Sequence, residues 1–359
     1  MRASLTPDKV VFVIPGDPES RTGGYIYDRR IMSGLEELGW RVELCNLGEG
    51  FPFPSTSVRA TSAKQLSALP DSSLVVVDGL AGGVLPDEMG ALTKRCRLVA
   101  LVHHPLALET GLRPEDQARL LRSEAEGLAH AHRVIVPGPA TARSLTQDYG
   151  LEPGRIGVVR PGTDPIPRPQ VRPARQTAGV ALLIVATVTP RKGHDLLIEA
   201  LRRLAGLPWT LTCVGSMHRD PAYARKVLGA IEDGGFTERV HMVGEVAPDQ
   251  LARYYQAADA FVLPSYLEGY GMVLADALAQ GLPIISTSGG AIPDTVPDGA
   301  GILVPPGDLE ALAQALEKII RDPTLRKRLG VAAARAASAL PTWPESSASF
   351  ARELRKAGS

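Results

Sequence analysis

Two cations and two acids stand where they could bind a charged ligand that is rich in hydroxyl groups. Arg191 and Lys192 follow the apolar run ALLIVATV, and Glu268 follows the run AFVLPS. Adjacent cations at the carboxyl end of a strand suit a diphosphate that is bound and then released as a leaving group. Glu268, and Asp276 about two turns into the next helix, could accept hydrogen bonds from sugar and ribose hydroxyls. Each pair alone also fits a solvated surface.

A second set of candidates lies in the first half of the chain. Gly23 and Gly24 precede the helical pattern YDRRIMSGLEELG, and His103 and His104 end the run RLVALVHH. Amides at a helix start can bind a phosphate, because the helix dipole favours an anion there. A histidine with an ordinary pKa near ~6.5 could be neutral and either donate or accept a hydrogen bond. A simple turn and a structural histidine are the alternatives.

The elements that carry these residues alternate along the chain. Short, continuous apolar runs such as VVFVIP and RVIVPG alternate with helical patterns, which is typical of a parallel sheet with helices on both faces. The alternation stops in the proline-rich stretch RPGTDPIPRPQVRPARQTAG and restarts with ALLIVATV. The 359 residues therefore predict an α/β protein with two facing, doubly wound domains and a ligand cleft between them.

Composition limits the classes of partner. Lys plus Arg equals Asp plus Glu, 39 of each, so no overall field favours nucleic acid or an anionic membrane. Arg29 and Arg30 on the first helix are balanced by Asp28, Glu36 and Glu37, which leaves no basic face for a membrane. The chain has no apolar run of ~18 residues and no segment like a signal peptide. We therefore expect a cytoplasmic protein.

The order of motifs resembles the retaining glycosyltransferases of family four, also described as glycosyl transferases of group 1. The resemblance covers nearly the whole chain: the Gly-Gly loop, VVRPGTD, TPRKG, CVG, HMVGEV, the acidic stretch from Pro264 and GILVPPGD. It implies the GT-B fold, with two Rossmann-like domains. Residues 1–165 would form the acceptor side, residues 166–340 would bind the nucleotide sugar, and residues 341–359 would form a helix that crosses back to the first domain.

The resemblance also implies roles for the acids and the histidine. Glu268 would contact the donor sugar, Asp276 would bind the ribose, and His103 would touch the sugar near its reacting carbon, with His104 as the alternative. The chain departs from the family at Asp276, where Glu is usual. Since Asp is one methylene shorter, the ribose contact would need a small helix shift or a bridging water.

The same resemblance assigns the diphosphate to Arg191 and Lys192, together with backbone amides of the residues Gly23, Gly24, Gly271, Met272 and Val273. The chain contains no Asp-x-Asp triplet of the kind that holds a divalent metal in other transferases. We therefore expect a reaction that needs neither metal nor cofactor. The family's front-face mechanism would move a hexose from a nucleoside-diphosphate sugar with retention, and the leaving phosphate oxygen would take the acceptor's proton.

Three other functions compete with this one. A sugar-nucleotide epimerase would release no free nucleotide, and a glycosidase would need two carboxylates that flank the bond and no nucleotide site. A non-catalytic sensor of nucleotide sugars is the alternative outside enzymes, and Asp276 gives it some support. Nucleotide release separates the transferase from these alternatives. The sequence determines neither the donor base nor the acceptor, for which a small molecule, a glycan and a lipid-linked molecule are all open.

Overall fold

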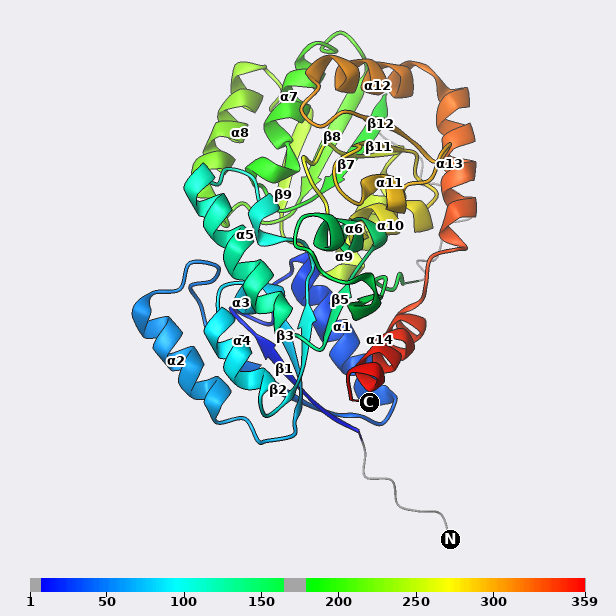
Figure 1. The fold of residues 1–359 in the computed structure, drawn as a ribbon. Coiled ribbons are helices and arrows are strands. Elements are labelled where there is room, and N and C mark those ends of the chain that lie inside the picture. Colours follow the sequence, from blue (N-terminus) through cyan, green and yellow to red (C-terminus); the bar gives the residue numbers. More distant parts are fainter. Residues whose placement is uncertain (1–7, 165–178, 359) are drawn as a thin grey trace. The chain divides into compact units, whose positions relative to one another are not determined.

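The computed structural model describes residues 8–164 and 179–358 (Figure 1). The chain forms two compact units. Unit 1 consists of Met1–Gly162 together with Pro341–Ser359, and unit 2 consists of Thr163–Leu340. The division falls three residues before the boundary expected at residue 165.

Unit 1 is built on a parallel sheet of six strands in the order β2-β1-β3-β4-β5-β6. The apolar runs of the sequence form its central strands, where residues such as Val13 and Val99 are fully buried. The strands are β1 (Lys9–Ile14), β2 (Arg41–Asn46), β3 (Leu74–Asp78), β4 (Arg97–Leu101), β5 (Arg133–Val136) and β6 (Ile156–Val158).

Unit 1 also contains helices, most of which connect its strands. They are α1 (Gly23–Glu37), α2 (Thr56–Ser67), α3 (Gly79–Gly82), α4 (Pro86–Thr93), α5 (Pro114–Ala129), α6 (Pro139–Gln147) and α14 (Trp343–Gly358), with the 3-10 turns η1 (Leu106–Leu108) and η2 (Pro153–Arg155). Proline begins α4, α5 and α6, where its missing N–H costs no helical hydrogen bond.

Unit 2 repeats this plan with a parallel sheet in the order β12-β11-β10-β7-β8-β9. Its strands are β7 (Val180–Val185), β8 (Trp209–Val214), β9 (Val240–Gly244), β10 (Ala260–Leu263), β11 (Ile284–Thr287) and β12 (Gly301–Val304). Its helices are η3 (Pro190–Lys192), α7 (His194–Arg202), α8 (Pro221–Asp233), α9 (Pro248–Ala257), α10 (Met272–Ala279), α11 (Ile292–Thr295), α12 (Leu309–Arg321) and α13 (Pro323–Ala337). The predicted fold class, two Rossmann-like α/β domains, is confirmed.

The last helix, α14, belongs to unit 1 and packs on elements that lie far from it in the sequence. It lies beside α1 (Figure 1), and its buried Phe350 stacks on Phe12 of β1 with ring centroids 5.9 Å apart. Gly34 of α1 faces Ser347, and a Cβ at Gly34 would collide with the Ser347 hydroxyl. The core of unit 1 therefore includes side chains from the last residues of the chain.

Among the described residues, none of the helices is long and apolar enough to cross a membrane.

Candidate active site

Three of the candidate residues meet at the carboxyl end of the second sheet. The 3-10 turn after β7 carries Arg191 and Lys192, and the loop after β10 carries Glu268. Because β7 and β10 are parallel neighbours, the segments that follow them leave the same edge of the sheet. Lys192 Nζ donates to Glu268 Oε1 at 2.6 Å, and Arg191 lies 3.6 Å from Glu268 Oε2.

Backbone contacts hold these two segments together. The Arg191 guanidinium donates to the Leu267 carbonyl at 2.7 Å, and the Tyr266 amide donates to the Arg191 carbonyl at 2.8 Å. Gly193 follows with a φ of +70°, and a Cβ there would collide with the Pro264 carbonyl. The glycine of the TPRKG motif is thus needed because the two loops approach backbone to backbone.

The ion pair fixes the charge of Glu268. Its side chain is only 8 % exposed, and burial by itself would raise its pKa. The charges of Lys192 and Arg191, together with hydrogen bonds, outweigh burial and hold the pKa of Glu268 below its ordinary value. At neutral pH the carboxylate is therefore ionised, and it holds the Lys192 ammonium at one place on the sheet edge.

Helix α10 begins directly after this loop. Gly271 occupies its N-cap position with a φ of +84°, and Met272 and Val273 are its first two residues. The first amides of a helix have no acceptor within the helix, so this end can accept an anion. The residues expected to complete the diphosphate site thus lie in the first turn of α10.

Asp276 lies one turn into α10, whereas its spacing from Glu268 suggested two turns. The difference arises because the loop extends to Gly271 before the helix begins. Asp276 is half-buried and, within the described residues, has no hydrogen bond or ion pair with Glu268, Arg191 or Lys192. Burial and the charge of Asp164 raise the pKa of Asp276 to about 7.

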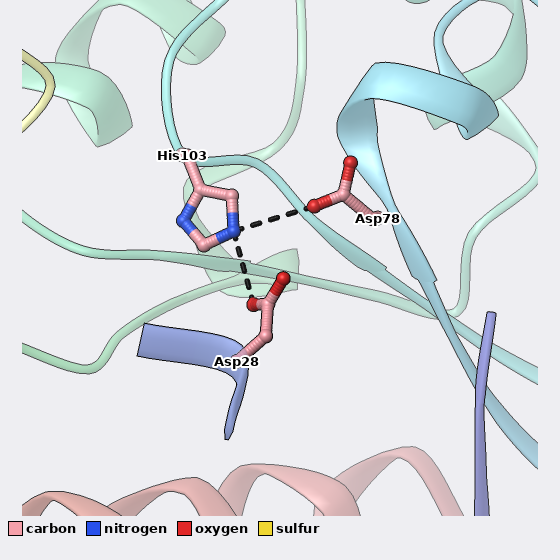
Figure 2. Close-up of side chains that lie close together, drawn as sticks. All are labelled: Asp28, Asp78 and His103. Carbon is pink, nitrogen blue, oxygen red and sulfur yellow. Dashed lines mark hydrogen bonds and ion pairs between the residues drawn. The ribbon is translucent and has the colours of Figure 1, made fainter. Parts of the chain in front are cut away.

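The first sheet has a cluster of its own at its carboxyl end, formed by Asp28, Asp78 and His103 (Figure 2). Asp78 is the last residue of β3, and His103 follows the adjacent strand β4. Asp28 comes from α1, the helix that Gly23 begins. His103 Nε2 lies 3.0 Å from Asp28 Oδ1 and 3.3 Å from Asp78 Oδ2.

These two carboxylates change the expected charge of His103. Burial by itself would lower the pKa of the imidazole, but Asp28 and Asp78 outweigh it and raise the pKa to about 10. The two carboxylates therefore favour the imidazolium form over the neutral histidine considered from the sequence. Asp28 is also not the surface charge that the sequence suggested, since only 1 % of it is exposed.

The neighbouring residues separate His103 from His104. His104 Nε2 faces Glu109 at 3.3 Å and has no part in the carboxylate pair. Gly24 lies directly against His103, because a Cβ at Gly24 would be 3.2 Å from His103 Cδ2. The structure thus brings the start of α1 and His103 together within unit 1.

The cluster also has the donor types of a divalent metal site. One imidazole nitrogen and two carboxylate oxygens lie within 4.8 Å of one another, a set that suits zinc or manganese. The same separations are ordinary hydrogen-bond lengths, so a proton on Nε2 accounts for them without an ion.

Comparisons with known proteins match both units. Residues 172–336 match the family described as "Glycosyl transferases group 1", and residues 82–166 match "Glycosyltransferase Family 4". The chain is 31 % identical over 295 residues to D-inositol 3-phosphate glycosyltransferase of Rhodococcus erythropolis. This match covers 78 % of this chain and 66 % of the relative. For the Nocardia farcinica protein of the same name, identity is 32 % and coverage is 69 % and 60 %. The chain thus spans about two thirds or less of the length of these relatives.

Solved structures share the fold. Sucrose-phosphate synthase from Thermosynechococcus elongatus matches with a TM-score of 0.82 at 22 % identity and covers 97 % of this chain and 98 % of its own. HepE of Anabaena, solved in complex with UDP-glucose, matches with a TM-score of 0.73 at 19 % identity and covers 97 % and 99 %.

Proposed function

The chain belongs to the glycosyl transferases of group 1, and from this premise we propose that it moves a hexose from a nucleoside-diphosphate sugar to an acceptor hydroxyl. The observation that carries the proposal is the partly buried contact of Lys192 and Arg191 with Glu268 at the carboxyl end of the second sheet. It puts two cations for a diphosphate beside an acceptor for sugar hydroxyls. A sugar nucleotide needs both kinds of group close together, because its sugar is bonded directly to its diphosphate.

In this proposal unit 2 binds the donor. Arg191 and Lys192 contact the diphosphate, and amides of Met272 and Val273 at the start of α10 add donors for its oxygens. As negative charge develops on the leaving diphosphate, the two cations stabilise it, so that no metal is required. Glu268 accepts hydrogen bonds from the sugar, and Asp276 accepts one from the ribose.

Unit 1 contributes His103 to the sugar and the amides of Gly23 and Gly24 to the diphosphate. The acceptor hydroxyl attacks the anomeric carbon on the face from which the diphosphate leaves, and the leaving phosphate oxygen takes its proton. The anomeric configuration is therefore retained, and no side chain acts as a nucleophile.

The names of similar proteins suggest the first substrates to try. HepE of Anabaena was solved with UDP-glucose, which makes UDP-glucose the first donor. The relatives named D-inositol 3-phosphate glycosyltransferase make inositol 3-phosphate the first acceptor.

Nucleotide release tests the proposal. UDP-, GDP-, ADP- and dTDP-sugars are incubated with the protein and a chelator, with and without inositol 3-phosphate, and free nucleotide is measured. We expect one donor to be consumed in the presence of chelator, and Lys192→Ala and Glu268→Gln to lower kcat/KM at least roughly a hundredfold each. NMR of the product then gives the configuration at the anomeric carbon.

Lys226→Ala is the matched control, because Lys226 also pairs with an acid of unit 2, Asp195, but is exposed. This control should keep the parent's rate. Binding of a sugar nucleotide without any release would favour a sensor, and isomerisation of the sugar without release would favour an epimerase. Loss of activity with chelator that returns with a divalent metal would overturn metal independence.

A further inference from the structure

Two carboxylates contact the same nitrogen of His103. Its Nε2 faces Asp28 Oδ1 and Asp78 Oδ2, and both oxygens of an ionised carboxylate only accept hydrogen bonds. Nε2 must therefore carry a proton. Nδ1 points away from both acids (Figure 2), and it has no hydrogen-bond partner among the described residues. The side chain is 21 % exposed, so this second nitrogen is the edge that a ligand can reach.

Hydrogen bonds anchor the Asp78 carboxylate and the helix that carries Asp28. The two oxygens of Asp78 have different partners. Oδ1 accepts from the Leu80 amide at 2.7 Å, and Oδ2 faces His103. Asp28 belongs to α1, and the adjacent Tyr27 donates its hydroxyl to the Val159 carbonyl at 3.0 Å. The Tyr27 ring also meets the imidazole edge to face, with centroids 5.5 Å apart. The imidazole therefore cannot turn without breaking several contacts.

We propose that Asp28 and Asp78 are positioning residues for His103, which turn Nε2 inward and present Nδ1–H as a hydrogen-bond donor to an oxygen of the bound sugar nucleotide. This inference rests on the proposed function. A neutral imidazole has one ring proton, and here Nε2 requires it. Nδ1 is consequently a donor only in the imidazolium form, and a second carboxylate is what makes that form persist at neutral pH.

The charges around the ring support this assignment. Asp28 and Asp78 raise the pKa of His103 to about 10 against the opposing effect of burial. Tyr27, which also lies against the ring, is buried, and burial raises its pKa well above the ordinary value, so it stays neutral. The pKa of Asp28 is raised by burial and by Asp78, while His103 and Arg29 lower it. With both acids ionised, one positive imidazolium between them pairs one of the two negative charges.

An NMR titration tests the positioning without any turnover. The protein with ¹⁵N-labelled histidine shows seven side chains, and the His103 resonances are those absent from His103→Gln. We expect an imidazolium from pH 6 to 9 in the parent. In Asp28→Asn, His103 should titrate at least roughly two pH units lower, and Asp78→Asn should shift it in the same direction. Asp78→Asn also keeps the test valid if Asp28→Asn does not fold.

Glu109→Gln is the matched control, since Glu109 faces the adjacent His104 at the same 3.3 Å that separates Asp78 from His103. It should leave the His103 titration unchanged. An ordinary titration of His103 in the parent would overturn the proposal. So would the binding of one equivalent of zinc or manganese at pH 7 that shifts the His103 resonances in the parent but not in Asp28→Asn.

A pH profile of kcat separates positioning from a loss of structure. Asp28→Asn should approach the parent's kcat at pH 6, where His103 is still protonated, and lose roughly tenfold by pH 9 as it becomes neutral. An equal loss at every pH would mean that Asp28 only stabilises the fold. If the parent turns over no donor at all, the proposed function fails, while the NMR titration still decides whether the two acids set the charge and orientation of His103.

Discussion

Neighbouring charges decide whether the carboxyl groups of Glu268 and Asp276 are ionised. The pKa of Glu268 is lowered despite its burial, because Lys192 and Arg191 lie against it. The pKa of Asp276 is raised to about 7, because burial and Asp164 act on it with no cation among its causes. Two carboxyl groups eight residues apart in the sequence thus differ in charge near neutral pH.

The raised pKa of Asp276 predicts pH-dependent donor binding. If its ionised form accepts from the ribose, affinity for the donor should rise about tenfold from pH 6 to pH 8, since the ionised fraction rises by that factor around a pKa of 7. Calorimetric titration of UDP-glucose, or of whichever donor is consumed in the nucleotide-release experiment, measures this. Asp276→Asn should bind weakly with a flat profile, and a flat profile in the parent would remove Asp276 from the ribose site.

The same group has an effect on stability of opposite sign. Its folded-state pKa lies above its unfolded value, so the folded chain holds a proton that the unfolded chain has lost. Its contribution to the free energy of unfolding therefore falls as pH rises from about 4 to 7. Asp276 gains function with rising pH while the fold loses a little stability.

Spacing in the sequence predicted some of these residues and missed others. The predicted cations and Glu268 do meet, because each follows a strand and parallel neighbours end at one edge. Asp28 was misread because it stands among Arg29, Arg30 and glutamates, a pattern typical of an exposed helix face. Its partner His103 lies 75 positions away, and a charge pattern within one helix does not contain such a contact.

At the scale of elements, the contact of α1 with α14 depends on a glycine. Gly34→Ala should raise helix propensity by about 1 kcal/mol. Here it should instead lower the free energy of unfolding by about 1 to 3 kcal/mol, because the new methyl group collides with the Ser347 side chain. Urea denaturation measures the change, and Ser347→Gly in the same chain should restore part of the loss.

Gly229→Ala is the control for this experiment. Gly229 lies inside α8, and a Cβ there meets nothing within 4 Å. The same substitution should therefore stabilise the protein by about 0.5 to 1 kcal/mol. If Gly34→Ala stabilised it as well, the two helices would be less closely packed than the structure has them.

At the scale of the whole chain, the pattern of apolar runs predicted two sheets but not every partner of their helices. Continuous apolar strands fix a parallel sheet, since only burial on both faces explains them. The place of α14 on α1 was implied by resemblance alone. Its amphipathic pattern requires some apolar surface, and nothing in the pattern says whether that surface is Phe12 of unit 1 or a residue of unit 2.

We predict that a substitution in the core of one unit destabilises that unit and not the other, and Phe350 tests this. It is fully buried against Phe12, so Phe350→Ala should cost about 3 to 5 kcal/mol, all of it in unit 1. Hydrogen exchange followed by mass spectrometry should show faster exchange than in the parent in peptides of Met1–Gly162. Peptides of Thr163–Leu340 should exchange at the parent's rate. Phe261→Ala, in the buried strand β10, should give the reverse pattern. Equal acceleration in both units would show that they unfold as one.

The order of segments also bears on biosynthesis. Along the chain, unit 2 lies between Met1–Gly162 and α14. As the polypeptide leaves the ribosome, the first sheet emerges early but lacks the aromatic side chain that covers Phe12 until about 190 further residues have been added, counting from Gly162 to Phe350. Unit 2 has its entire sequence available before that. The second unit can therefore fold first, and during that interval the nascent first unit exposes an apolar surface of the kind that chaperones bind.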